Sequence, residues 1–106
     1  MYKKLASFSL PILYLLLLSQ ATLATIAPIN TDQEKYARET LQKAVPKLTA
    51  TIKQDPQNAT AYANRGITYY RLKEYDLGRT DVKKAQALGY QFSTRNQPII
   101  DSLLSN

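Results

Sequence analysis

The chain has 106 residues, which is enough for one small domain. Cysteine and histidine are both absent, so the sequence excludes a disulfide framework, thiolate metal sites and the side chain that most often moves protons near neutral pH. The net charge is +6, but basic and acidic residues are interspersed, which is typical of a solvated helix surface. We therefore expect no cofactor, no metal site and no nucleic-acid partner.

The first residues have the layout of a secretory signal peptide. Lys3 and Lys4 precede an apolar run over residues 10–18, and a stretch rich in small residues follows. Small side chains one and three positions before the cut permit cleavage after Ala21, Ala24 or Ala27, and we favour Ala24. This predicts a signal peptide over residues 1–24 and a mature chain that is secreted or periplasmic.

An uncleaved anchor is the alternative for the same segment. A membrane-spanning helix needs about 20 mostly apolar residues, and residues 5–29 reach that length only if several polar side chains are tolerated. We therefore expect a membrane association only if the segment is not cleaved. In both cases the remainder lies outside the cytoplasm.

A linker over residues 25–31 is predicted to lead into a helical domain over residues 32–106. Thr31 or Asp32 would cap the first helix. Apolar residues then recur at helical spacing, namely Tyr36, Leu41, Ala44 or Val45, Leu48 and Ile52. Pro46 removes a hydrogen bond from a helix interior, so we expect either a kink near Val45 or two short helices.

Residues 59–72 and 75–88 are each predicted to form a helix, joined by a short turn, with Asn58 as the cap of the first. The buried residues are expected to be Tyr62, Gly66, Tyr69, Tyr75, Gly78, Val82 and Ala85. Each helical glycine costs about 1 kcal/mol relative to alanine, which indicates that the two backbones approach closely at Gly66 and Gly78. Gly89 then ends the second helix.

The end of the chain is predicted to form a last short helix with Pro98 in its first turn. Its apolar residues are Ile99, Ile100, Leu103 and Leu104, and we expect them to cover the open end of the helical pair. No segment shows the alternation of a β-strand, so the fold class is all-α, a helix–turn–helix hairpin packed against flanking helices.

The hairpin resembles one tetratricopeptide repeat, a helix–turn–helix of 34 residues, over about residues 59–92. The resemblance rests on the spacing of the seven buried residues and on the phrases "AYANRG", "YYRLKEYD" and "DVKKAQALGY". Arg65, Arg79 and Tyr90 depart from the pattern. We expect the aliphatic part of the Arg65 side chain to pack against the fold while its guanidinium reaches water. We expect Arg79 to reduce the apolar contact between the second helix and the element that follows it.

The resemblance implies a protein or peptide partner, held in a groove lined by the first helix of the repeat. The matching residues are Thr60, Ala63, Asn64, Ile67, Tyr70 and Arg71. Asn64 and Arg71 would donate hydrogen bonds to the partner, and Tyr70 would supply a rigid contact. The alternative is that these are ordinary solvated residues.

No pattern typical of an enzyme occurs. The carboxylates are dispersed, and Asp76 and Asp81 are expected to point to different sides of their helix. Asn58 begins an N-glycosylation sequon, although helix capping explains the same residue. We predict a non-catalytic exported interaction module or scaffold. The alternative is a structural component, either a self-assembling homo-oligomer or a small membrane-tethered subunit.

Overall fold

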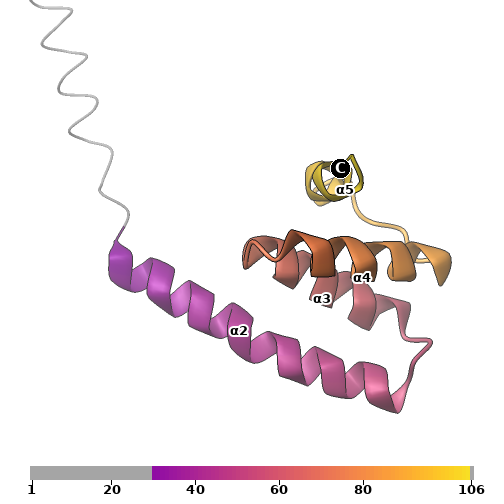
Figure 1. The fold of residues 1–106 in the computed structure, drawn as a ribbon, viewed down its shortest axis with the longest axis horizontal. Helices are drawn as coiled ribbons and strands as arrows, with labels where there is room; N and C mark the ends of the chain where they lie inside the picture. The colour runs from indigo at the N-terminus through magenta and orange to yellow at the C-terminus, as the bar shows by residue number, and fades with distance from the viewer. Residues whose placement is uncertain (1–29, 106) are drawn as a thin grey trace, which may run out of the picture. The chain divides into compact units, whose positions relative to one another are not determined.

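A computed structural model describes residues 30–105, and this part of the chain is all-α (Figure 1), as predicted. The helices are α2 (Thr31–Gln54), α3 (Ala59–Arg71), α4 (Tyr75–Ala87) and α5 (Gln97–Leu104). None of these described helices is both long and apolar enough to cross a membrane. The predicted signal peptide and its alternative as an anchor lie outside the described residues. Residues from Glu34 onward form one compact unit.

Helix α2 continues through Pro46 without interruption, so the prediction of two short helices was wrong. Pro46 is exposed, and water can therefore hydrate the carbonyl that loses its intrahelical partner. The cap also differs from the prediction, because the Asn30 side chain accepts a hydrogen bond from the Asp32 backbone N–H at 3.0 Å. The helix thus begins at Thr31, the last residue of the predicted linker.

Helices α3 and α4 pack closely at Gly66 and Gly78, as the sequence predicted. A Cβ atom added to Gly66 would lie 3.1 Å from the Gly78 carbonyl oxygen and 3.0 Å from Cγ2 of Val82. A Cβ atom added to Gly78 would lie 3.0 Å from the Gly66 carbonyl oxygen. Only hydrogen fits between the two backbones at this point, so the helical cost of both glycines is offset by the contact they permit.

The ends of the hairpin helices are closed by local hydrogen bonds. Asn58 caps α3, since its side chain accepts from the Ala61 N–H at 2.9 Å. Both α3 and α4 end in a Schellman motif, with a left-handed residue just after the helix. That residue is Gly89 after α4, with φ 90°, and Lys73 after α3, with φ 63°.

Helix α5 lies against α4 and α3, and Figure 1 shows it nearly end-on above α4. A cluster of Val82, Ile100 and Leu103 forms the buried contact, with Tyr70, Phe92 and Ile99 packed around it. The Arg79 Nε donates to the carbonyl of Leu103 at 2.7 Å. Arg79 was expected to reduce the apolar contact at this interface, but its hydrogen bond instead links the C-terminal end of α5 to α4.

Helix α2 joins the hairpin through side chains. Ile52 is its one buried residue, and Thr49 receives a hydrogen bond from the Arg65 guanidinium at 3.1 Å. In the described part of the chain, no Cα atom of α2 comes within 8 Å of one in α3, α4 or α5. The backbone of α2 therefore stands further from its neighbours than α3 does from α4.

Candidate interaction surfaces

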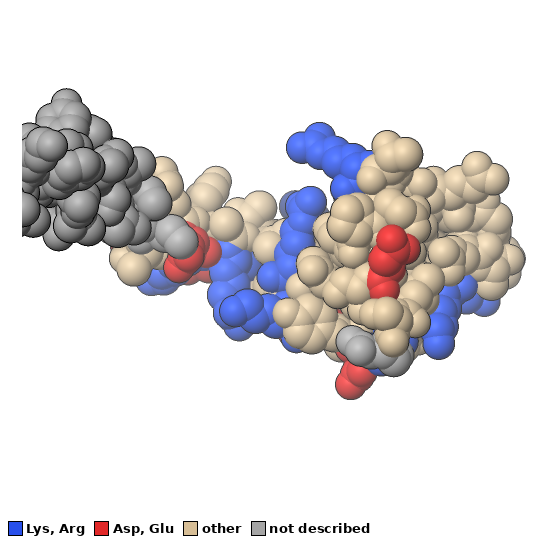
Figure 2. Space-filling view, turned by 90° about the horizontal axis from the view of Figure 1, so that it is seen from above, with Lys and Arg blue, Asp and Glu red and all other residues tan. Residues whose placement is uncertain are grey.

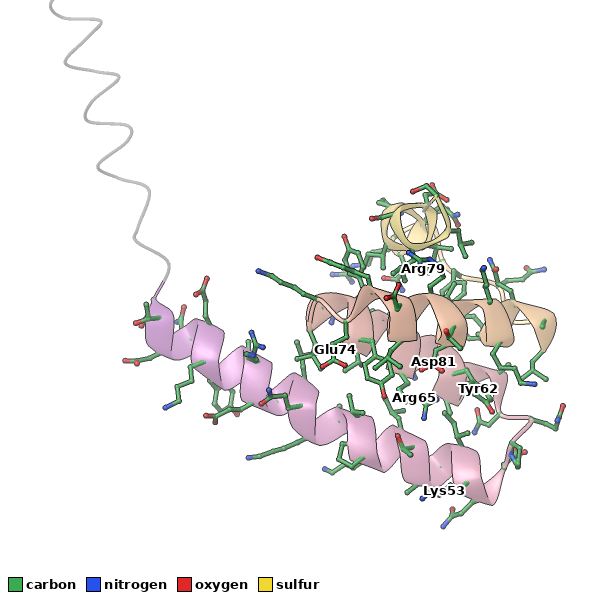
Figure 3. The ribbon with its side chains drawn as sticks, in the orientation of Figure 1. Lys53, Tyr62, Arg65, Glu74, Arg79 and Asp81 are labelled. Carbon is green, nitrogen blue, oxygen red and sulfur yellow. The ribbon has the colours of Figure 1, made fainter. Side chains whose placement is uncertain are left out.

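An ion pair between α3 and α4 contains Asp81, which at 3% exposure is the most buried charged residue of the described part of the chain. Nε of Arg65 donates to Oδ2 of Asp81 at 2.7 Å, and Nη2 donates to Oδ1 at 2.8 Å. The two side chains meet in the space between α2, α3 and α4 (Figure 3). The head of Arg65 was expected to reach water, but its side chain is only 17% exposed and that of Asp81 only 5%.

The surroundings keep Arg65 charged. The pKa of Arg65 is raised above its ordinary value, first by the hydrogen bond to Asp81 and also by the charge of that carboxylate, against an opposing effect of burial. The rings of Tyr62 and Tyr69 lie with their centroids 5.8 Å from the guanidinium carbon, within the range of a cation–π attraction. A planar guanidinium can make all these contacts together, whereas a lysine cannot.

This polar cluster is structural. Every buried side-chain nitrogen and oxygen in residues 30–105 has a hydrogen-bond partner, so the cluster offers no unpaired group to a ligand. Asp76 and Asp81 point to different sides, as expected, because Asp76 is exposed and pairs with Arg79 at 2.9 Å. Between residues 30 and 105, no group of three or more acidic side chains is placed to hold a metal ion.

Three of the predicted partner-binding residues form an exposed stripe along α3, namely Thr60, Asn64 and Arg71. Their separations of four and seven residues place them on one helical face. No side chain of the three has a hydrogen-bond partner among those found in the described residues. We call this set the α3 stripe, and it is available to a partner.

The remaining groove residues are covered. Ile67 is only 9% exposed and Ala63 is fully buried, so the prediction that they face an open groove was wrong. Tyr70 is partly buried against the cluster that α5 completes. Tyr70 is covered because α5 lies against α3, an arrangement that the spacing within the hairpin cannot reveal.

Tyr75 also differs from its predicted place in the core. It is 48% exposed, and its ring meets that of Tyr70 edge-on with centroids 5.5 Å apart. Tyr62 and Tyr69 are partly buried, whereas Gly66, Gly78, Val82 and Ala85 are buried as predicted. Tyr75 begins α4 beyond the glycine contact, where no described helix covers it completely.

An open hollow of about 550 Å³ lies where α4 begins and α5 ends. We call it the α4–α5 hollow, and it is lined by Lys73, Glu74, Tyr75, Asp76, Leu77, Arg79, Ser102 and Leu103. Tyr75 and Leu77 are both about half exposed, and Leu104 next to the hollow is 37% exposed. This surface was not predicted from the sequence, because no spacing pattern around Leu77 separates it from the core positions.

The comparisons with known proteins find a partial likeness. No family model matches the chain, and no solved structure matches it. A stretch of 47 residues is 45% identical to Neutrophil cytosol factor 2 of Mus musculus, and it covers 44% of this chain. The match spans 9% of the length of that protein, so the chain is similar to one small segment of a much longer polypeptide.

Proposed function

We propose that this chain is a small exported module that binds another protein through a tetratricopeptide-like helical hairpin and catalyses no reaction. The α3 stripe is the binding surface, with Asn64 and Arg71 as the hydrogen-bond donors. The observation that carries the proposal is the hairpin itself. Its helices pack at Gly66 and Gly78 while Thr60, Asn64 and Arg71 stay exposed on one face.

Two further observations support a binding role. The likeness to a segment of a long protein is what a module used within larger proteins would produce. In addition, the hydrogen bonds of the Arg65 cluster hold α3 rigidly against α4. A partner that binds the α3 stripe therefore meets an ordered surface, which lowers the entropy lost on binding.

The absence of catalysis is proposed from the chemistry of the side chains. Histidine and cysteine do not occur in the sequence, and the buried acid Asp81 is committed to Arg65. General acid–base work would then fall to exposed carboxylates that are dispersed over the described residues.

The test is an affinity capture from the exported fraction of the host, with the full chain as bait. The variant Asn64→Glu with Arg71→Glu reverses the charge of the α3 stripe, and Lys83→Glu with Lys84→Glu changes charge on exposed positions of α4. We expect a partner that the wild type and the α4 variant retain and the α3 variant loses. Equal capture by all three would refute the α3 stripe as the binding surface.

Export is tested separately by the intact mass of the protein recovered from its host. Loss of residues 1–24 is the expected result. A full-length mass together with recovery in the membrane fraction would instead indicate the membrane-tethered subunit.

The α4–α5 hollow favours a second candidate function, the self-assembling structural component. Tyr75 and Leu77 line this hollow and are about half exposed, and exposed apolar groups often mark association surfaces. Sedimentation velocity of the wild type and Leu77→Ser distinguishes the two functions. An oligomer that dissociates in the variant would support assembly, whereas a monomer at all concentrations would leave the binding module as the function.

A further inference from the structure

The outward side of α2 carries a second surface that the fold leaves uncovered. Six residues line a shallow hollow of about 320 Å³ on this side, namely Tyr36, Glu39, Thr40, Lys43, Ala44 and Lys47. They come from successive turns of the helix and so share one face. We call them the α2 stripe. Tyr36 is 74% exposed, the highest value among the large hydrophobic residues found exposed in the described part.

The apolar side of α2 that meets the hairpin is a different one. Ile52 is buried there, and Leu41, Val45 and Leu48 are partly buried. On a helix with 3.6 residues per turn, Tyr36, Lys43 and Lys47 lie roughly opposite to these residues. Tyr36, Lys43 and Lys47, all exposed, therefore play no part in holding α2 to the hairpin, and Ala44 lies at the edge between the two sides.

The charges of the α2 stripe are not used within the fold. The ion pairs found among residues 30–105 join Arg65 to Asp81 and Arg79 to Asp76, so neither Lys43 nor Lys47 takes part in one. These lysines are four residues apart, a spacing at which like charges on a helix repel. From residue 40 to residue 54 the helix contains three lysines and no acidic residue, and Figure 2 shows basic side chains gathered along α2.

We propose that the α2 stripe binds an acidic, helical segment of a partner protein. An apolar side chain of that segment would sit beside Tyr36 and Ala44, and two of its carboxylates would meet Lys43 and Lys47. The hydroxyl of Thr40 donates to the Tyr36 carbonyl at 2.9 Å, so the lysine ammonium groups and the Tyr36 hydroxyl are the donors left to the partner. This surface is separate from the α3 stripe and does not depend on it.

Charge and apolar content argue against other occupants. A second copy of α2 is unsuitable, because residues 34–54 carry five basic and two acidic side chains and two such faces repel each other. A membrane surface is unsuitable because Tyr36 is the one large apolar residue of the stripe, whereas interfacial helices bury several. Nucleic acid is disfavoured because the hollow offers only two basic side chains, Lys43 and Lys47, whereas nucleic-acid binding depends on many phosphate contacts.

The test uses a fluorescein-labelled peptide of about 18 residues, long enough to form a helix, with leucines on one face flanked by glutamates four residues apart. Its twin has glutamine in place of each glutamate. Fluorescence anisotropy with the full chain should give an affinity about tenfold higher for the acidic peptide, as two exposed ion pairs would supply. The preference should shrink as salt is raised.

Three variants locate the binding site. Lys43→Glu with Lys47→Glu should abolish the preference for the acidic peptide, and Tyr36→Ala should weaken both peptides. Lys83→Glu with Lys84→Glu makes the same charge change on exposed positions of α4 and should alter the affinity by less than about twofold. Asn64→Glu with Arg71→Glu should leave it unchanged, so that failure here is distinguishable from failure of the α3 stripe.

Three results would overturn the proposal. The first is equal binding of the acidic peptide and its twin, and the second is an equal loss of affinity in the α2 and α4 lysine variants. The third is seen with vesicles that contain anionic phosphatidylglycerol. If they bind the chain with a dependence on Lys43 and Lys47 while the peptide does not bind, the α2 stripe is a membrane surface instead.

Discussion

The guanidinium of Arg65 and the carboxylate of Asp81 form a two-pronged ion pair between α3 and α4, with N–O distances of 2.7 and 2.8 Å. A third arm of the same guanidinium donates to Thr49 on α2. One side chain thus connects three helices, at a position where the tetratricopeptide pattern usually has an aliphatic residue.

Removing the carboxylate should destabilise the fold strongly. In Asp81→Asn the charge of Arg65 stays in place without its counter-ion, which typically costs about 3 kcal/mol in a buried setting. The free energy of unfolding can be measured by urea titration followed by circular dichroism. The double variant Arg65→Met with Asp81→Leu removes both charges and should recover to within about 1 kcal/mol of wild type. A loss below about 1 kcal/mol in Asp81→Asn would show that the pair contributes little.

Gly78→Ala should destabilise the hairpin although alanine is the better helix former. The new Cβ would lie 3.0 Å from the Gly66 carbonyl oxygen, and backbone cannot move aside cheaply. Overpacking of this kind costs about 1–3 kcal/mol, which exceeds the gain in helix propensity of about 1 kcal/mol. Gln86→Ala, at an exposed position of α4, is the control and should change the melting temperature little. A stabilised Gly78→Ala would contradict the close contact.

Lys73→Gly should stabilise the protein. Lys73 holds φ 63° after the end of α3, a conformation that glycine adopts without strain, so we expect a gain of about 0.5–1 kcal/mol. The same substitution at Lys83, inside α4, should cost about 1 kcal/mol. Thermal unfolding of both variants checks the opposite signs. A destabilised Lys73→Gly would mean that the lysine side chain contributes more than its backbone costs.

Asn58→Ala should cost about 1 kcal/mol through loss of the α3 cap. Asn58→Asp should keep most of the stability, because aspartate caps as well as asparagine does. Thr60→Ala removes the glycosylation sequon without touching the cap, so it separates the two explanations for Asn58. If Thr60→Ala lowers the stability of host-expressed protein as much as Asn58→Ala does, a glycan is the better explanation.

Arg79→Met should loosen α5. The variant loses the hydrogen bond from Nε to the Leu103 carbonyl, and a bond with a charged donor contributes about 1.5 kcal/mol or more. Hydrogen exchange of the α5 amides should therefore quicken by about tenfold, while exchange in α3 changes little. Arg71→Met, an exposed position at the end of α3, is the matched control. Unchanged exchange in α5 would show that Val82, Ile100 and Leu103 hold this helix alone.

The hairpin was the most predictable part of the fold. Its helices were placed at residues 59–72 and 75–88, and the structure has Ala59–Arg71 and Tyr75–Ala87. The Asn58 cap, the Gly66–Gly78 contact and the end at Gly89 were predicted because each depends on residues close in sequence or on glycine itself. Features of this kind depend on the type of one residue or of its close neighbours in sequence, so they can be predicted from a single sequence.

The errors concern contacts between distant segments. Arg65 and Asp81 are sixteen residues apart, and no local spacing pattern links the two. Two features of the sequence could have indicated this ion pair. Arg65 stands at a position expected to be apolar, and Asp81 directly precedes the core residue Val82. Ile67 was assigned to an open groove although it is only 9% exposed, because helical spacing alone does not show which positions the packed helices cover. The exposed α3 stripe remains a prediction about binding.

The backbone of α3 meets that of α4 at two glycines, whereas α2 reaches the hairpin only through side chains. The two interfaces should therefore differ in how they accept sequence change. At the glycine contact even one added methyl group collides with a carbonyl oxygen, so few substitutions of these two glycines should be tolerated. Along α2, side chains of different sizes can adjust their rotamers within the wider gap. In a library of variants, folded members should therefore carry more substitutions on the hairpin-facing side of α2 than at the glycine contact. Helix α2 is thus the part of the module whose side chains can be changed in size with least loss of stability.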